Sequence, residues 1–346
     1  MPINKRSMPK NIKTIQLGKS RIGGANPTFI VAEVANTHEG DFNTAKRMVD
    51  LIKDTGVDAV KFQLHIADAE MLPSHPKFET TKKRSLTADQ IAYLKKYSET
   101  NGLTFLCTPF SREAIDILVD IGMDSIKIGS GEASDPGFLE HAARKKKPLI
   151  VSTGMATKNQ IGGMASLLNK HKVSYMFLHT VSKYPPEYKD LNLGYIKKMQ
   201  KMYDVPVGFS DHLPEIYSSI AAVSHGASMI EKHYTLDRNQ VGTSDHKVSL
   251  EPAEFKEMVS AIRKVEKAGG TIKIINREEE MVKAWANHSV VSVCDIKQGQ
   301  RIKAELITTK RPLYDGIPAH NMHDLIGRKA KINIKKDSII KWDYVN

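Results

Sequence analysis

The chain has 346 residues, 40% of them hydrophobic, and a formal net charge of +12. No apolar run reaches the ~18 residues that a membrane span requires. The basic N-terminal segment also lacks the apolar stretch of a secretory signal, so we expect a cytoplasmic protein with no membrane partner. Lysines are spread over the predicted helices rather than gathered with aromatic residues, which argues against nucleic-acid binding and favours attraction of anionic substrates.

The first predicted element is a short hairpin within residues 13–28. Its turn signals are Gly23-Gly24 and Asn26-Pro27. We expect residues 1–28 to form a tail and this hairpin, which would close the base of the domain that follows.

From residue 29 onward, short apolar runs alternate with amphipathic segments of helical length. Strand followed by helix, repeated eight times, predicts a (β/α)₈ (TIM) barrel over residues 29–270. Several of the predicted helices stop at a glycine, which is typical of a helix C-terminus. The predicted strands are residues 29–34, 59–65, 104–110, 125–130, 148–154, 174–180, 206–212 and 229–235.

The composition changes after the barrel. Residues 271–285 are polar and charged, and we interpret them as a linker. In the remaining residues, 286–346, the segments 294–307 and 332–345 are weak copies of each other. An internal duplication of this size predicts a small, pseudo-symmetric, β-rich domain.

Polar side chains mark the C-terminal ends of the predicted strands, where barrel enzymes carry their catalytic groups. Because a strand alternates its faces, Glu231 and His233 should point into the barrel and Lys232 away from it. His212 and His233 end neighbouring strands and could share a divalent cation such as Mn²⁺. The alternative is two unrelated histidines, each satisfied by hydrogen bonds.

A second group of strand-end residues has the chemistry of an anion site. Lysines supply charge, small hydroxyls donate hydrogen bonds, and glycines let backbone N–H groups approach a phosphate. The group consists of Lys61, Lys127, Ser130, Ser152 and Ser210, with the segment Gly129-Ser-Gly131. Two alternatives stay open: a lysine that forms a Schiff base, and ion pairs with Glu33, Glu132 or Glu231.

In chain order, these motifs resemble the N-acetylneuraminate (sialic acid) synthase family, and the C-terminal segment resembles its antifreeze-like (SAF) domain. The resemblance covers nearly the whole chain. The matching stretches are AEVANTHEGD (32–41), AVKFQLH (59–65), FLCTPF (105–110), IKIGSGE (126–132), IVSTGM (150–155), SKYPPEYKDLNL (182–193), VGFSDH (207–212), IEKHYTLD (230–237), SDHKVSLEP (244–252) and KRP (310–312).

This resemblance implies a metal-dependent condensation of phosphoenolpyruvate with an N-acetylated amino-sugar aldehyde, typically N-acetylmannosamine. The metal would be Mn²⁺, or else Mg²⁺ or Co²⁺, bound by His212 and His233. Phosphoenolpyruvate would be bound by Lys61, Thr108, Lys127, Ser130, Ser152, Ser182 and Ser210. The sugar would be bound by Gln63, Glu132, Tyr184, Asp245 and Arg311, and the catalytic residues would be Glu33, Lys61, Lys127, Glu231 and Arg311.

The resemblance also implies a domain-swapped homodimer in which Arg311 reaches the active site of the other subunit. Thr37 and Thr243-Ser244 differ from the residues usual in the family, where Asn and Gly-Pro are common. These differences lie around the expected sugar pocket. They leave legionaminic or pseudaminic acid synthesis, and a 6-phosphorylated sugar substrate, as alternatives.

Overall fold

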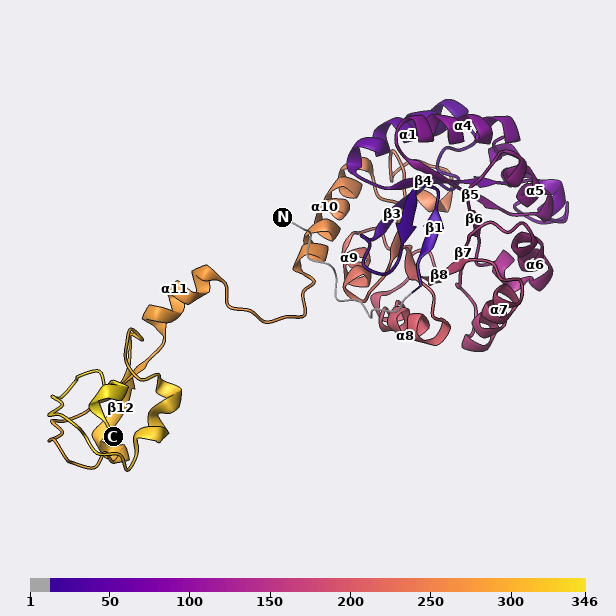
Figure 1. Cartoon of the computed structure of the whole chain (residues 1–346). Coiled ribbons are helices and arrows are strands. Elements are labelled where there is room, and N and C mark those ends of the chain that lie inside the picture. Colours follow the sequence, from indigo (N-terminus) through magenta and orange to yellow (C-terminus); the bar gives the residue numbers. More distant parts are fainter. Residues whose placement is uncertain (1–12) are drawn as a thin grey trace. The chain divides into compact units, whose positions relative to one another are not determined.

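The computed structural model describes residues 13–346 and divides into two compact units, Met1–Gly270 and Thr271–Asn346 (Figure 1). We describe each unit by itself. Among the described residues, no helix is long and apolar enough to cross a membrane.

The first unit is built on eight parallel strands. They pair in the order β5-β4-β3-β10-β9-β8-β7-β6, and β5 and β6 lie next to each other, so the sheet is a nearly closed barrel. The predicted (β/α)₈ fold is therefore confirmed. The strands are β3 (Phe29–Glu33), β4 (Ala59–Leu64), β5 (Thr104–Pro109), β6 (Ile126–Ile128), β7 (Leu149–Ser152), β8 (Tyr175–Thr180), β9 (Val207–Asp211) and β10 (Met229–His233).

Helices surround the strands as an outer layer (Figure 1). Local capping fixes where several of them begin: Thr87 and Thr157 each form a capping box with the glutamine three residues later. The helices are α1 (Phe42–Ile52), α2 (Ala67–Glu70), α3 (Phe78–Arg84), α4 (Ala88–Thr100), α5 (Arg112–Asp120), α6 (Pro136–Arg144), α7 (Lys158–Lys170), α8 (Gly194–Tyr203), α9 (Tyr217–Ser224) and α10 (Pro252–Ala268).

The barrel has two apolar clusters. The larger one lies between the strands and the helices. In the smaller one, Ile15, Leu17 and Ile22 of the hairpin β1 (Ile15–Leu17) and β2 (Ser20–Ile22) join inward-facing strand residues such as Val31 and Met229. The hairpin thus closes one end of the barrel as predicted, and the polar site lies at the other end.

The second unit begins with helix α11 (Arg277–Ala286), which lies in the segment that the sequence led us to expect as a linker. Strands β11 (Ser289–Ser292) and β12 (Ile307–Lys310) are antiparallel. Ile296 and Ile334, the third residues of the two sequence copies, form an antiparallel bridge with each other through two 2.8 Å hydrogen bonds. The duplicated segments therefore pair at equivalent positions, and both of these isoleucines lie in one small core.

Candidate active site

A cavity of about 470 Å³ lies at the C-terminal ends of the barrel strands. It collects residues from all eight strands or the loops that follow them. Its lining consists of Glu33, Lys77, Phe110, Lys127, Gly129, Ser130, Gly131, Glu132, Ser152, Met155, Thr180, Ser182, Tyr184, Ser210, His212, Glu231 and His233. Most of the residues predicted for the site thus meet at one surface.

The floor of the site is a buried group of opposite charges. Lys61 Nζ lies 2.6 Å from Glu231 Oε2 and 3.4 Å from Glu33 Oε2. All three side chains are buried. Removing charged side chains from water costs free energy unless the charges bind one another or a ligand. Ion pairing, which the sequence left open for Lys61, is therefore real, and it occurs at the base of a cavity.

The second lysine is less engaged with carboxylates. Lys127 Nζ donates to Ser152 Oγ at 2.7 Å and lies 3.8 Å from Glu231 Oε1. Burial lowers the pKa of Lys127 to about 8, and this effect exceeds the opposing attraction of Glu231. The ammonium is thus still charged at neutral pH and has capacity for an anionic ligand on the cavity wall.

The two floor carboxylates have different proton affinities. Burial raises the pKa of Glu33 to about 7, although the charge of Lys61 opposes the rise. Burial would also raise the pKa of Glu231, but Lys127 and Lys61 overcome it and hold that pKa at about 2. At neutral pH, Glu231 is ionised and Glu33 is close to half protonated, which suits a fixed charge and a proton carrier respectively.

His212 and His233 have the properties of metal ligands. Their ring centroids lie 5.3 Å apart. Burial lowers the pKa of His212 to about 4 and that of His233 to about 3, so both rings are neutral at pH 7. His212 Nδ1 lies 2.8 Å from the carbonyl oxygen of Val181 and donates to it in the neutral ring, which leaves the lone pair on Nε2.

The donor set at this position is small. His233 Nδ1 is buried and has no hydrogen-bond partner among the described residues. The part of the chain that the structure describes contains no cluster of three or more His, Cys, Asp or Glu side chains able to hold an ion. Two neutral imidazoles fit a borderline divalent cation, and its other ligands would have to come from water or substrates.

Hydroxyl groups line the side of the cavity near Lys127. Ser130 Oγ accepts a hydrogen bond from the Gly154 backbone at 3.1 Å. A Cβ atom at Gly154 would lie 2.2 Å from Ser182 Oγ, so only glycine allows these hydroxyls to converge. Ser210 Oγ donates to Glu231 Oε1 at 3.0 Å. Thr108 Oγ1 is buried and lacks a hydrogen-bond partner within residues 13–346.

The residues predicted for the sugar are more dispersed. Gln63 Nε2 donates to Glu33 Oε1 at 3.0 Å, which orients that carboxylate. The Tyr184 ring stacks on His212 at a centroid distance of 4.1 Å. Burial raises the pKa of Tyr184, and the negative charge of Asp245 adds to the rise. Glu132 lines the cavity itself.

Some lining residues were not predicted, and five predicted residues are not among those that line the cavity: Lys61, Gln63, Thr108, Asp245 and Arg311. Lys77, Met155 and Thr180 line the cavity. Thr180 ends β8 and had the same positional signal as its neighbours, whereas Lys77 lies in the long β4–α4 connection and had none. Arg311 is exposed and belongs to the second unit, directly after β12.

The chain is similar to several biosynthetic enzymes over most of its length. The chain is 34% identical to the N,N'-diacetyllegionaminic acid synthase of Campylobacter jejuni, over 91% of this chain and 99% of that protein. It is 31% identical to human N-acetylneuraminate-9-phosphate synthase, over 94% of both chains. A crystal structure of N-acetylneuraminic acid (sialic acid) synthetase from Leptospira borgpetersenii, in complex with citrate, superposes with a TM-score of 0.74 at 34% identity and covers 78% of this chain and 95% of that one.

Two family models match the chain in succession. The model of the NeuB family matches residues 48–273, which is most of the barrel. The model of the SAF domain matches residues 287–346, the segment with the internal duplication. The chain therefore belongs to the NeuB family and carries a C-terminal SAF domain.

Proposed function

We propose that this protein condenses phosphoenolpyruvate with the open-chain aldehyde of N-acetylmannosamine and with water, giving N-acetylneuraminate and phosphate. The observation that carries the proposal is a pair of buried lysines beside converging serine hydroxyls, in the same cavity as a pair of neutral histidines. The first group suits an anionic phosphate and carboxylate. The second suits a metal ion next to a sugar.

The chain's own groups supply positioning, charge and proton transfer. Lys127 and Ser152 would hold the anionic groups of phosphoenolpyruvate, with Lys61 at the base of the site. Carbon 3 of phosphoenolpyruvate then attacks the aldehyde carbon, and positive charge develops at carbon 2. Glu33, with its pKa of about 7, is suited to take a proton from the water that adds there, and the tetrahedral intermediate expels phosphate by C–O cleavage.

Glu231 remains ionised throughout and would stabilise the positive charge at carbon 2. His212 and His233 would hold the divalent metal, Mn²⁺ by our expectation, which when bound polarises the aldehyde oxygen. Gln63, Glu132, Tyr184 and Asp245 would orient the sugar.

Several amino sugars fit this reaction besides N-acetylmannosamine. The diacetamido sugars that precede legionaminic and pseudaminic acids, and N-acetylmannosamine 6-phosphate, present the same aldehyde to the same floor. They differ at the end of the sugar that is distant from the reacting carbon. Specificity therefore depends on the rim of the cavity and not on the floor.

Phosphate release from phosphoenolpyruvate tests both the reaction and the sugar. We expect protein treated with EDTA to release phosphate with one of these sugars only after Mn²⁺ is added. The expected gain on adding Mn²⁺ is about 100-fold or more, comparable to the loss of one preorganised stabiliser of a developing oxyanion. The sugars offered would be N-acetylmannosamine, its 6-phosphate and the two diacetamido sugars.

A second outcome would favour a different class of enzyme. The pKa of Lys127, lowered to about 8 by burial, is also a property of lysines that form Schiff bases. If no sugar releases phosphate, and borohydride traps pyruvate on Lys127, the chain is an aldolase of that class and the present proposal is wrong.

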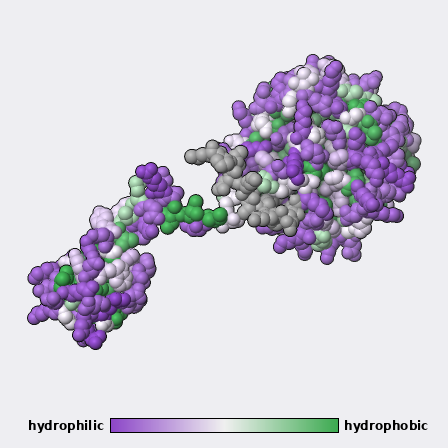
Figure 2. Space-filling view, viewed as in Figure 1, coloured by the Kyte–Doolittle hydropathy of each residue, from purple (hydrophilic) through white to green (hydrophobic). Residues whose placement is uncertain are grey.

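We also propose a homodimer in which Arg311 completes the active site of the other subunit. The two cysteines, Cys107 and Cys294, are free thiols, which fits a reducing compartment such as the cytoplasm. Apolar side chains are exposed along residues 272–285, including Ile272, Met281 and Trp285. Figure 2 shows hydrophobic colouring on the segment that leads into α11. An exposed apolar stretch of this kind is typical of an interaction surface, and a second copy of the chain is the partner that we infer for it.

Mixing two inactive variants tests the swap directly. Arg311→Ala should lower kcat/KM for the sugar about 10- to 100-fold, as expected for losing a charged hydrogen bond. Equal mixing with Lys127→Met should restore activity at about a quarter of the sites, because half of the dimers are mixed and each has one intact site. If Arg311 acts within its own subunit, the mixture stays as inactive as the separate variants.

A further inference from the structure

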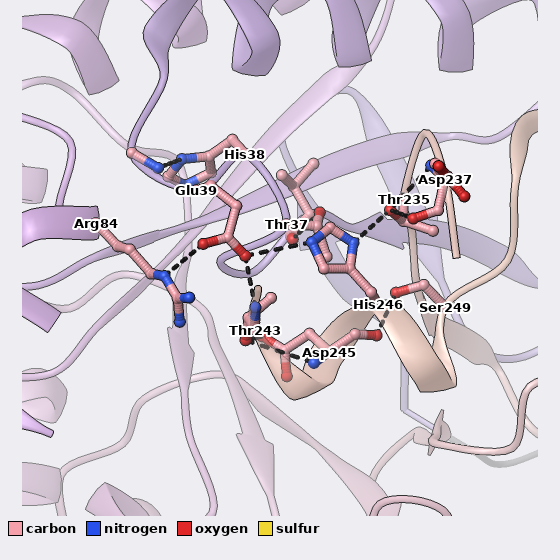
Figure 3. A network of polar contacts seen from close by, with 12 residues as sticks. Thr37, His38, Glu39, Arg84, Thr235, Asp237, Thr243, Asp245, His246 and Ser249 are labelled. Carbon is pink, nitrogen blue, oxygen red and sulfur yellow. Dashed lines mark hydrogen bonds and ion pairs between the residues drawn. The ribbon is translucent and has the colours of Figure 1, made fainter. Parts of the chain in front are cut away.

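A polar network at the mouth of the barrel joins three segments that are distant in the sequence (Figure 3). Glu39, in the loop after β3, lies at its centre. Glu39 Oε1 accepts a hydrogen bond from the Thr243 backbone at 2.5 Å and lies 3.3 Å from His246 Nε2. Glu39 Oε2 lies 2.6 Å from Arg84 Nε at the end of α3. One carboxylate therefore ties the loop after β10 to α3 and to the loop after β3.

The backbone around Glu39 is held in an uncommon conformation. Glu39 has a φ of 52° and Gly40 a φ of 85°. A Cβ atom on Gly40 would lie 2.7 Å from the carbonyl oxygen of Lys83, so this turn packs directly on the backbone of α3. A non-glycine residue in the left-handed region costs free energy, and it persists where its surroundings fix it. The position of Glu39 is thus determined by the fold and not by local preference.

The loop between β10 and α10 packs just as closely against the Glu39 side chain. A Cβ atom on Gly242 would lie 2.1 Å from Glu39 Oε1, whereas the neighbouring Val241 is 97% exposed. Residue 242 has no positive φ that would require glycine for its own sake. Glycine at 242 therefore serves the close approach of the β10–α10 loop to the Glu39 carboxylate.

The network extends from Glu39 to Asp245, which lies in a 3₁₀ turn, η4 (Ser244–Val248). Thr243 Oγ1 donates to Asp245 Oδ2 at 3.2 Å, and Ser249 Oγ donates to the Asp245 carbonyl oxygen at 2.7 Å. His246 is buried and bridges Glu39 and the Thr235 hydroxyl, which lies 2.7 Å from its Nδ1. Asp245 is thus flanked on both sides by residues that contact Glu39.

We propose that Glu39 is a positioning residue that fixes the loop of residues 235–249 so that the Asp245 carboxylate faces the amino sugar at the cavity mouth. This inference rests on the proposed function, in which Asp245 orients the sugar. Glu39 would not touch the substrate. It acts through Thr243 and His246, and Arg84 holds its carboxylate in place. Thr243 binds Glu39 through its backbone N–H, whereas its side chain binds Asp245, so one residue links the two carboxylates.

The test separates sugar binding from phosphoenolpyruvate binding. Glu39→Ala should raise the KM for the sugar about tenfold, an effect of about 1.4 kcal/mol, and leave the KM for phosphoenolpyruvate within about twofold. Glu39→Gln keeps an oxygen for the Thr243 N–H but loses the charge that attracts Arg84, so it should give an intermediate sugar KM. A general loss of stability would change the KM values for the sugar and for phosphoenolpyruvate together, or neither of them. Glu39→Gln would then give no intermediate value of the sugar KM.

Gly242→Ala disturbs the same contact from the β10–α10 loop, and it provides the test if Glu39→Ala does not fold. Alone, it should raise the sugar KM by pushing the loop from Glu39. In the Glu39→Ala background, where the obstructing carboxylate is absent, it should add less than about a twofold change. Additive effects in the double variant would contradict a shared contact. Glu99→Ala removes a surface ion pair with Lys95 on α4 and should change neither KM.

The two proposals fail in different ways. If the wild-type protein releases phosphate with none of the sugars, the proposed function fails before Glu39 is tested. If the wild-type protein is active and Glu39→Ala leaves the sugar KM unchanged, or raises both KM values equally, the positioning role of Glu39 is wrong and the proposed function stands.

Discussion

Lys61→Met should lower kcat/KM for phosphate release by about 10³-fold, the upper end of what losing one preorganised electrostatic group costs. Lys61 is the cation that lies between Glu33 and Glu231, 3.4 and 2.6 Å from their oxygens. Without it, two buried carboxylates face each other, and the base of the site becomes repulsive to an anionic substrate. Steady-state phosphate release at saturating sugar measures this effect.

The same substitution should reduce the free energy of unfolding by about 3–5 kcal/mol, because it leaves buried carboxylates without their partner. Denaturant unfolding measures this loss. The double variant Lys61→Met/Glu231→Gln should recover much of the stability and none of the activity. Recovery of both would show that Lys61 acts only on stability, and a single variant within tenfold of wild-type activity would remove Lys61 from the mechanism.

Much of the fold follows from local patterns. The strands were recognisable because parallel barrel strands are buried on both faces and read as short apolar runs. Alternation also predicted the directions of the side chains on β10: Glu231 and His233 line the cavity, and Lys232 is buried on the other side against Asp211. Most of the site could be predicted from positions at strand ends, because the C-terminal ends of all strands lie together at one end of a barrel.

The remaining features depend on contacts that one-dimensional patterns do not contain. The opposite pKa shifts of Glu33 and Glu231 arise from their distances to Lys61 and Lys127. Helix α11 was missed because its composition is polar, although Asn276 and Glu279 form a capping box that marks its start. Glu39 was missed because its partners lie more than 40 residues further along the chain, Arg84 at the end of α3 and Thr243 in the loop after β10.

Lys232→Met should cost about 3–5 kcal/mol in the free energy of unfolding, as much as Lys61→Met. Lys232 Nζ lies 2.8 Å from Asp211 Oδ2, and both side chains are fully buried. Ser218 and Ser219 of α9 also donate to that oxygen, at 2.6 and 2.7 Å. Removing the ammonium leaves a buried carboxylate whose remaining donors are neutral. Denaturant unfolding of the two proteins gives the difference.

A surface pair provides the matched control. Arg144→Met removes an i,i+4 ion pair with Glu140 on α6 and should cost less than about 1 kcal/mol. Asp211→Asn/Lys232→Met should be more stable than Lys232→Met alone, because no uncompensated charge remains. Asp211 and Lys232 immediately precede His212 and His233, so the ion pair also fixes the strand ends that carry the imidazoles. If Lys232→Met unfolds like the wild-type protein, the pair contributes little to stability, and the spacing of those histidines must be set by the barrel backbone alone.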